Sequence, residues 1–406
     1  TTGFNNTAVG YQAMLTNTTS AHNTALGYQA LYTNTTSNYN TAIGDKALYT
    51  NNGESNTGVG RWALTANTTG SSNVAIGNYS LDANTTGSQN VAIGLNALGS
   101  NTTVNNNTAV GYEALKSNTT GTPNTAVGMR ALEDNTTGNN NVAVGYQALE
   151  SNTTATDNTA VGSNCLQANT TGSHNTAVGL NALDGNTTGQ RNTTIGYNAI
   201  TNSTTGNNNT SLGADTMVSN STGHDNTAVG AWALNSNSTG SNNVGIGASA
   251  LEASTTASGN TAVGWKSQLR TTTGSGNISV GQNTLENITT HNYNTAIGNA
   301  ALRDSTASSN TAVGYNALQA NTTGEYNVAV GSGAMTQSTT AQRCTAVGRE
   351  AGESLTTGSY NTLLGYTAGH EITTGYRNVA IGEESMYFVT TGSLNVCVGN
   401  QTLHLN

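Results

Sequence analysis

The chain has 406 residues, of which 34% are hydrophobic and only 8% are charged, and its formal net charge is −9 at pH 7. These shares exclude an ordinary globular domain with a large core, and a single Pro beside sixteen Tyr is unlike a disordered chain. An acidic balance without a basic stripe argues against nucleic acid as a partner. No stretch approaches the roughly 20 apolar residues of a membrane span, so we expect no membrane insertion in this segment.

An internal repeat runs through the whole sequence. From Thr1 the chain divides without remainder into 24 units, of which two are one position shorter than the rest, at residues 52–67 and 306–321. A typical full-length unit reads TTGSHNTAVGLNALDGN (residues 170–186), and its positions are numbered 1 to 17 below. The sequence begins and ends inside this pattern, so we expect it to be a segment of something longer.

A 17-residue unit is too short for a strand plus a helix, which leaves one coil of a parallel β-solenoid. Neighbouring coils of such a solenoid hydrogen-bond to each other about 4.8 Å apart. The sequence therefore predicts an all-β parallel β-solenoid of 24 coils, in which each 17-residue unit forms one coil. We expect a single continuous repeat array over residues 1–406, with variant units from about residue 339.

Positions 6 to 9, such as NTAV or NVAI, form the predicted strand, because β-branched residues fill it and Gly closes it. Position 9 is Val, Ile or Leu in all 24 units, and position 14 is Leu, Met or Ile in 21. We expect each coil to bury about one Val or Ile and one Leu. Position 8 is usually Ala, and this small-residue face is expected to meet something close, which would suit packing against copies of the chain.

The residue after the strand is Gly in all 24 units. This pattern predicts a corner where φ is positive or where another backbone approaches closely. The predicted corner glycines include Gly10, Gly27, Gly44, Gly77, Gly128, Gly230, Gly314 and Gly399.

Position 6 is Asn in 23 units, with Cys344 as the exception. Asn here, and often at position 17, fits corners where identical amides stack as a hydrogen-bonded ladder. Asn acting only as a turn former would explain the same column. The predicted ladder includes Asn6, Asn23, Asn40, Asn73, Asn124 and Asn226.

Thirteen units end in Asn followed by Thr-Thr or Ser-Thr, which is a formal N-glycosylation acceptor. Possible glycosylation sites are therefore Asn17, Asn34, Asn152 and Asn321. A turn with Thr-lined ladders accounts for the same residues. The regular column of Thr also makes an ice-binding solenoid a minor alternative.

Catalytic or metal-binding chemistry has no signature in this pattern. Cys165, Cys344 and Cys397 occupy different repeat positions, and the last two lie three coils apart, roughly 14 Å, beyond the ~7 Å reach of a disulfide. Each Cys then either replaces a small residue or contacts another chain at a trimer axis. The six His are scattered over four positions, so we expect solvated side chains rather than zinc ligands. We predict no enzyme activity, no catalytic residue, no cofactor and no bound metal.

The pattern changes near the C-terminus. Gly352 and Gly369 replace the aliphatic residue of position 14, while Leu355, Ile372 and Val389 bring one to position 17. We expect the core contact to move to a different corner in these coils.

Short strings within the units carry a resemblance to known fibres. NVAIG (residues 73–77, 90–94 and 378–382) and NTAVG (residues 124–128) resemble the coil signature of trimeric autotransporter adhesin heads. The longer pattern of the type NTAVGYQAL, with Thr-Thr-Gly between copies, resembles repeat tracts in phage tail fibres. The adhesin heads are left-handed parallel β-rolls of three chains with a shorter coil, so the resemblance implies a β-roll fibre and a homotrimer.

The expected function is structural or adhesive, as the shaft or head of an extracellular fibre such as a phage tail fibre or a bacterial surface adhesin. The main alternative is a subunit that polymerises end to end into an extracellular filament, possibly glycosylated, because neither end of the array carries a polar capping unit. The expected partners are copies of the chain, with a cell-surface glycan or receptor as a further possibility. The exposed Tyr of position 11 could contact sugars or stack in a ladder, as at Tyr11, Tyr28, Tyr112, Tyr146 and Tyr315.

Overall fold

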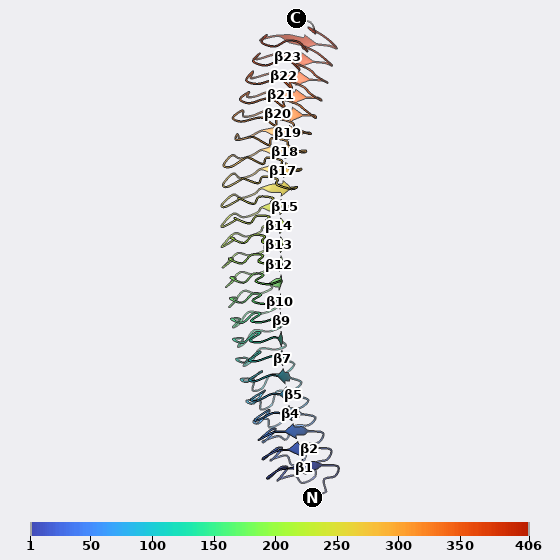
Figure 1. Ribbon diagram of the computed structural model, residues 1–406, viewed down its shortest axis with the longest axis vertical. Helices are drawn as coiled ribbons and strands as arrows, with labels where there is room; N and C mark the ends of the chain where they lie inside the picture. Colours follow the sequence, from blue (N-terminus) through green and yellow to red (C-terminus); the bar gives the residue numbers. More distant parts are fainter. Residues whose placement is uncertain (1, 405–406) are drawn as a thin grey trace. The chain divides into compact units, whose positions relative to one another are not determined.

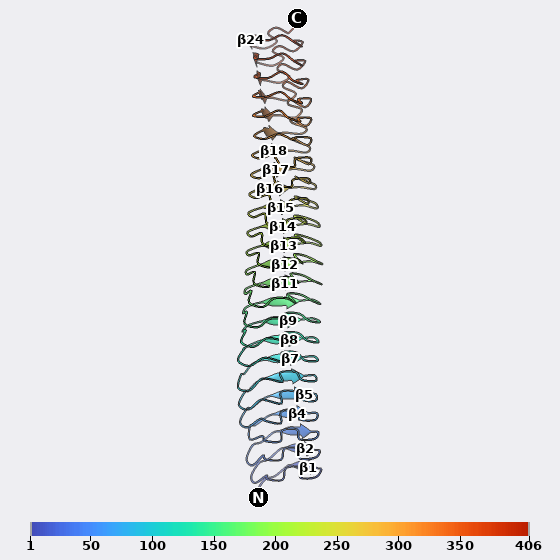
Figure 2. The same cartoon turned by 90° about the vertical axis from the view of Figure 1, so that its left-hand side faces the viewer.

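The computed structural model describes residues 2–404. These residues form two compact units, which divide after residue 206, and no described residue is helical. Each unit contains twelve three-residue strands that pair in parallel, and within each unit the strands lie in one column (Figures 1 and 2). The predicted all-β parallel solenoid, with one turn for each 17-residue unit of the sequence, is confirmed.

In the first compact unit the strands occupy positions 7 to 9 of successive coils. Their bounds are β1 (Thr7–Val9), β2 (Thr24–Leu26), β3 (Thr41–Ile43), β4 (Thr57–Val59), β5 (Val74–Ile76), β6 (Val91–Ile93), β7 (Thr108–Val110), β8 (Thr125–Val127), β9 (Val142–Val144), β10 (Thr159–Val161), β11 (Thr176–Val178) and β12 (Thr193–Ile195).

The second unit repeats the arrangement. Its strands are β13 (Thr210–Leu212), β14 (Thr227–Val229), β15 (Val244–Ile246), β16 (Thr261–Val263), β17 (Ile278–Val280), β18 (Thr295–Ile297), β19 (Thr311–Val313), β20 (Val328–Val330), β21 (Thr345–Val347), β22 (Thr362–Leu364), β23 (Val379–Ile381) and β24 (Val396–Val398).

Paired strands keep equivalent repeat positions side by side. Ala8 pairs with Ala25 and Val9 with Leu26, an offset of one full repeat unit. The 16-residue unit is absorbed without a change of register, since Thr41 pairs with Thr57. Every side chain therefore stands above its equivalent in the previous coil, which makes each repeat position a continuous column.

Backbone hydrogen bonds between coils extend far beyond the strands. Leu31 N donates to Ala47 O of the following coil at 3.0 Å, and Gln29 N donates to Tyr11 O of the preceding one at 2.9 Å. Both donors have left-handed φ values, 52° for Leu31 and 53° for Gln29, and the same holds at positions 12 and 14 of most coils. A left-handed conformation costs roughly 1–2 kcal/mol for a residue with a side chain, so bonding on both sides of the coil must offset that cost.

The core of each coil is thin. Ala at position 8 and the pair at positions 13 and 14 are fully buried, for example Ala42, Ala47 and Leu48. Position 8 faces position 14 of the previous coil, because a methyl group added to Gly58 would lie 3.2 Å from Leu48 Cγ.

This arrangement corrects the expected orientation of the strand. Successive residues of a strand point to opposite faces, so the buried Ala of position 8 turns positions 7 and 9 outward. Val9 is 55% exposed and Leu26 is 47% exposed. The predicted burial of one Val or Ile per coil is wrong, and the Ala face is not free for packing between chains because it packs in the core of its own solenoid.

Candidate functional site

The corner glycines fill the turn that follows the strand. Gly27 has φ 139°, and a Cβ on it would lie 2.4 Å from the carbonyl oxygen of Gly44 in the next coil. Positive φ and a close backbone approach therefore both require Gly at this corner. The glycines singled out from the sequence share φ values from 113° to 139°: Gly10, Gly27, Gly44, Gly77, Gly128, Gly230, Gly314 and Gly399.

The Asn of position 6 links consecutive coils. Asn6 Oδ1 accepts from the backbone N of Asn23 at 2.9 Å, and Asn23 Oδ1 accepts from the backbone N of Asn40 at 2.8 Å. The side-chain nitrogen of Asn23 donates to Ser37 O in the next coil at 3.0 Å. The amide thus satisfies buried backbone groups rather than only a neighbouring amide. The same column includes Asn73, Asn124 and Asn226.

Position 17 carries a second buried Asn column, which bears on glycosylation. Asn34, Asn152 and Asn321 are fully buried, and their side-chain nitrogens donate to Ser37 O at 2.9 Å, Asn135 Oδ1 at 2.8 Å and Gly324 O at 2.9 Å. A glycan on any of these nitrogens would have to replace these hydrogen bonds and leave the buried column. In the first coil Asn17 is half-buried, and its Oδ1 accepts from Ser20 N at 3.2 Å.

The outward residues of position 9 form what we call the aliphatic column, one Val, Ile or Leu from each of the 24 strands. Exposed fractions are 39% for Ile76, 37% for Val127 and 47% for Leu212. Beside it, position 7 presents 16 Thr, seven Val and one Ile, also outward. The strands of each unit therefore offer a ridged face without a charged residue at either position.

The Tyr residues of position 11 border this face and are exposed. Tyr11 and Tyr28 stack with ring centroids 5.5 Å apart and an interplanar angle of 8°. Only some coils carry Tyr at position 11, however. Tyr112, Tyr146 and Tyr315 have no second Tyr at this position in an adjacent coil. The column is therefore stacked only where consecutive coils both carry Tyr.

The cysteines are free thiols. Burial raises the pKa of Cys165 to about 12 and that of Cys344 to about 11. Cys344 takes the place of the ladder Asn, since its Sγ accepts from Asn361 N at 3.4 Å and donates to Gly358 O at 3.4 Å. Both buried thiols are replacements within a coil and cannot reach another chain, whereas Cys397 in β24 is only half-buried.

His370 departs from the expected solvated histidine. Its Nδ1 lies 2.9 Å from Glu371 Oε1 and its Nε2 lies 2.8 Å from Glu353 Oε2, and its ring stacks on Tyr387 with centroids 4.8 Å apart. Glu350 brings a third ligand-type side chain within 4.8 Å of His370 and Glu353. His370 therefore lies between two carboxylates, one from its own coil and one from the preceding coil, in a cluster with Glu350. His370 and Glu353 share position 15 in consecutive coils, and the repeat register could have revealed their contact.

A column of alternating Tyr and Arg occupies position 5 of four consecutive coils. We call Tyr326, Arg343, Tyr360 and Arg377 the tyrosine–arginine column. The Arg343 guanidinium carbon lies 5.7 Å from the Tyr326 ring centroid and 5.6 Å from that of Tyr360, and the Arg377 carbon lies 5.5 Å from Tyr360. Arg343 Nη1 also donates to the Tyr360 hydroxyl at 2.7 Å.

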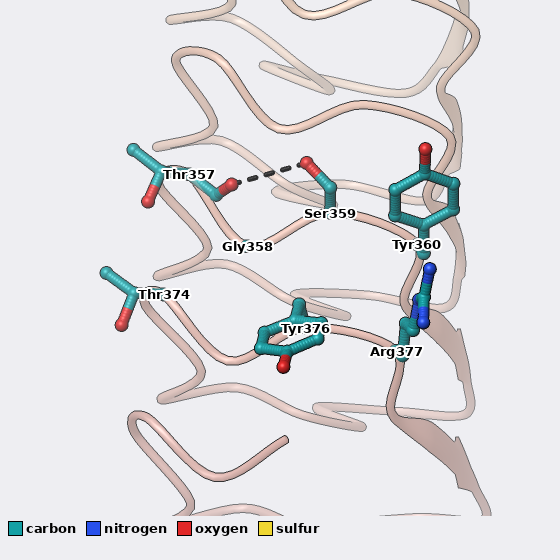
Figure 3. Close-up of a pocket in the computed structure, with 7 residues that line it drawn as sticks. All are labelled: Thr357, Gly358, Ser359, Tyr360, Thr374, Tyr376 and Arg377. Carbon is teal, nitrogen blue, oxygen red and sulfur yellow. Dashed lines mark hydrogen bonds between the residues drawn. The ribbon is translucent and has the colours of Figure 1, made fainter. Parts of the chain in front are cut away.

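An open groove of about 380 Å³ lies beside this column (Figure 3). Thr357 and Thr374 stand on one side of it, Tyr360 and Arg377 on the other, and the ring of Tyr376 lies between them. Ser359 donates to the backbone oxygen of Thr357 at 3.3 Å (Figure 3). This groove was not predicted from the sequence, although the alternation of Tyr and Arg at one repeat position was a readable signal.

Comparison with protein-family models gives no match for this chain, and comparison with curated proteins gives none either. Within residues 2–404 there is no helix with the length and apolar character of a membrane span.

Proposed function

We propose that this chain is a structural or adhesive component of an extracellular fibre, such as a phage tail fibre shaft or a surface adhesin head, and that it self-associates through the aliphatic column. It acts without catalysis. The observation that carries the proposal is that position 9 is aliphatic in every one of the 24 units although the solenoid turns it outward.

Other outward positions vary freely, which makes this constancy informative. Position 5, for example, holds His22, Tyr39, Gln89, Asp157 and Arg191. Strand propensity favours β-branched residues but would accept Thr at an exposed strand position, and Thr is what most units carry at position 7. A column that excludes every polar residue over 24 coils is better explained by burial against a partner.

A second copy of the chain is the partner that fits this face. Another solenoid presents the same column at the same coil spacing, so two parallel copies match coil for coil. The entropic cost of association, roughly 4–15 kcal/mol, arises once, whereas burial of the exposed part of each aliphatic side chain contributes of order 1 kcal/mol per coil. A parallel homotrimer is the assembly we favour, with three such faces around one axis.

The test replaces part of the aliphatic column with charges of alternating sign. The variant Ile76→Lys, Ile93→Glu and Val110→Lys changes three consecutive coils, and alternation limits repulsion between stacked charges. We expect the parent protein to have the mass of three chains by light scattering coupled to size exclusion, and this variant to dissociate to single chains with unchanged β-sheet circular dichroism.

The matched control places the same charges in the same coils on another face, as Ser72→Lys, Gln89→Glu and Asn106→Lys at exposed position 5. It should keep the mass of the parent. A monomeric parent at tens of micromolar, or an assembly that survives the charges in the aliphatic column, would contradict the proposal. Open-ended filaments would favour the end-to-end polymer instead.

Ice binding is the second candidate, because the outward strand face displays Thr at position 7 beside an aliphatic residue at position 9 in 16 coils. A regular array of this kind can order water. Inhibition of ice recrystallisation by a monomeric parent, abolished by Thr→Lys substitutions at position 7, would support this candidate over the fibre.

A further inference from the structure

We propose that the groove beside the tyrosine–arginine column binds an acidic polysaccharide in which acidic and neutral sugars alternate. The proposal builds on the proposed function, since an assembled fibre would repeat the groove once per copy, but the groove itself is formed by a single chain. All of its lining residues belong to the coils of β22 and β23, and Arg343 lies in the adjacent coil of β21.

The cations of the column are available to a ligand. Arginines paired with carboxylates among the described residues are Arg61, Arg130, Arg303 and Arg349. Arg343 and Arg377 are not among them and instead stack on Tyr rings. Contact with the Tyr rings helps to fix the orientation of each guanidinium. Arg343 uses one N–H on the Tyr360 hydroxyl, and its remaining N–H groups and those of Arg377 are the donors that carboxylates and sulfates recognise.

Tyr376 supplies an aromatic platform of a different kind. Its ring lies in the middle of the groove (Figure 3) and is 46% exposed, and its backbone N is bonded to Ser393 Oγ at 3.1 Å. The rings of the column contact guanidinium groups, whereas Tyr376 is an exposed ring outside that column. The apolar C–H face of a sugar ring fits such a surface, and the hydroxyls of Thr357 and Thr374 flank it (Figure 3).

The spacing of the column favours a saccharide with one charge in every two sugars. Arg343 and Arg377 are two coils apart, about 10 Å along the stack, which is comparable with the length of a disaccharide unit. The net charge of −9 opposes a densely charged polymer such as nucleic acid. A sparsely charged polysaccharide meets the two arginines with less repulsion from the rest of the chain.

The probe for the test is a hyaluronan octasaccharide, which alternates N-acetylglucosamine and glucuronic acid, titrated into the full chain by calorimetry at low salt. A neutral chitin octasaccharide and sodium sulfate serve as comparison ligands. We expect binding of hyaluronan, weakened at least tenfold by Arg377→Gln and by Tyr376→Ser, and weakened by added salt.

Arg191→Gln is the matched control, because Arg191 is an exposed Arg at the same repeat position without Tyr neighbours in its column. It should bind hyaluronan like the parent. Equal binding of the neutral saccharide, an equal loss in Arg191→Gln, displacement by millimolar sulfate alone or no binding at millimolar saccharide would each overturn the proposal. The mass of every variant is measured in parallel, so a failure of self-association is seen separately from a failure of binding.

Discussion

Cys165 shows what the thin core does to a single titratable group. It occupies position 13, where most coils carry Ala, it is fully buried, and its Sγ lies 3.2 Å from Ala177 O. Desolvation raises the pKa of its thiol to about 12. The thiolate is the reactive form of cysteine, so we expect Cys165 to resist alkylation in the folded chain.

The raised pKa of Cys165 also predicts how stability depends on pH. The unfolded thiol loses its proton near pH 9 while the folded one keeps it, so the unfolded state binds fewer protons between pH 9 and about 12. The free energy of unfolding should therefore fall in this window, by up to ~1.4 kcal/mol per pH unit for this group. Below pH 9 the contribution is fully present.

Urea unfolding of the parent and of Cys165→Ala between pH 8 and pH 11 measures this effect. The variant restores the common residue of position 13 and should lose stability more slowly with pH. Cys397→Ala, at a half-buried thiol, controls for general alkaline effects. Parallel curves for the parent and Cys165→Ala would show that the buried thiol does not contribute.

Residue preferences revealed the corners of the coil but not the left-handed φ values at the positions that follow them. Invariant Gly and Asn have few structural explanations, and Gly27 and Asn23 lie in the turns that the sequence indicated. Left-handed φ at Leu31 opposes the preference of a branched side chain. The bond from Leu31 N to Ala47 O of the next coil and the burial of the side chain offset that cost, and both depend on the stacking of coils rather than on the residue itself.

A single coil is stabilised by the packing of position 8 against position 14. In the C-terminal coils the large residue stands at position 8 and the small one at position 14. Leu363 stands at position 8 in place of Ala, and Gly352 and Gly369 leave space at position 14. A Cβ on Gly352 would lie 2.6 Å from Leu363 Cδ1, and one on Gly369 would lie 2.7 Å from Leu363 Cδ2. The usual pairing of Ala at position 8 with Leu at position 14 is therefore reversed in size in these coils.

This exchange predicts a coupled pair of substitutions. Leu363→Ala should destabilise by about 2–5 kcal/mol, because the glycines opposite cannot fill the cavity. Gly352→Leu should destabilise by about 1–3 kcal/mol through overpacking. The double variant recreates the Ala–Leu pairing of the other coils, and the φ of 61° at Gly352 is close to that of Leu31, so it should be more stable than Leu363→Ala.

Chemical denaturation of the four proteins gives the coupling energy of this cycle. Additive effects of the two substitutions would contradict a direct fit between positions 8 and 14. Leu363→Ala combined with Leu115→Ala, in a distant coil, provides the additive reference.

At the element scale, the periodicity predicted the strand and the shifted C-terminal contact but placed the wrong face inward. The shift is confirmed, because Leu355, Ile372 and Val389 are buried at position 17. The strand faces were misjudged because Val is more hydrophobic than Ala and was assigned to the core. Leu48 and its equivalents at position 14 leave room in the core for only a small residue at position 8. The sequence of the strand alone does not reveal how narrow this space is.

At the scale of the whole molecule, each of the two compact units is a stack in which a coil contacts the coils before and after it in the sequence. Stability is then approximately a sum of coil and interface contributions. The equivalence of the coils was readable from the period, and so was the tolerance of 16-residue units. The outward orientation of position 9 was not readable, because it depends on the inward turn of position 8.

Removal of one whole coil tests this additive construction. Deletion of residues 136–152 joins Asn135 at position 17 to Thr153 at position 1, so every column stays in register. The protein should fold with the same circular dichroism per residue, and its midpoint of thermal unfolding should change by only a few degrees, because one coil and one interface are lost among many equivalent ones.

Deletion of residues 136–143 is the comparison, since it leaves only part of a coil, which cannot close on its own. That fragment must either loop out or interrupt the buried Asn columns on both sides of it, so the smaller deletion should lower the unfolding midpoint more than the larger one. If the partial deletion proved as stable as the deletion of the whole coil, the columns would not be what couples the coils. The order of the two midpoints therefore decides whether stability follows the number of residues or the register of the repeat.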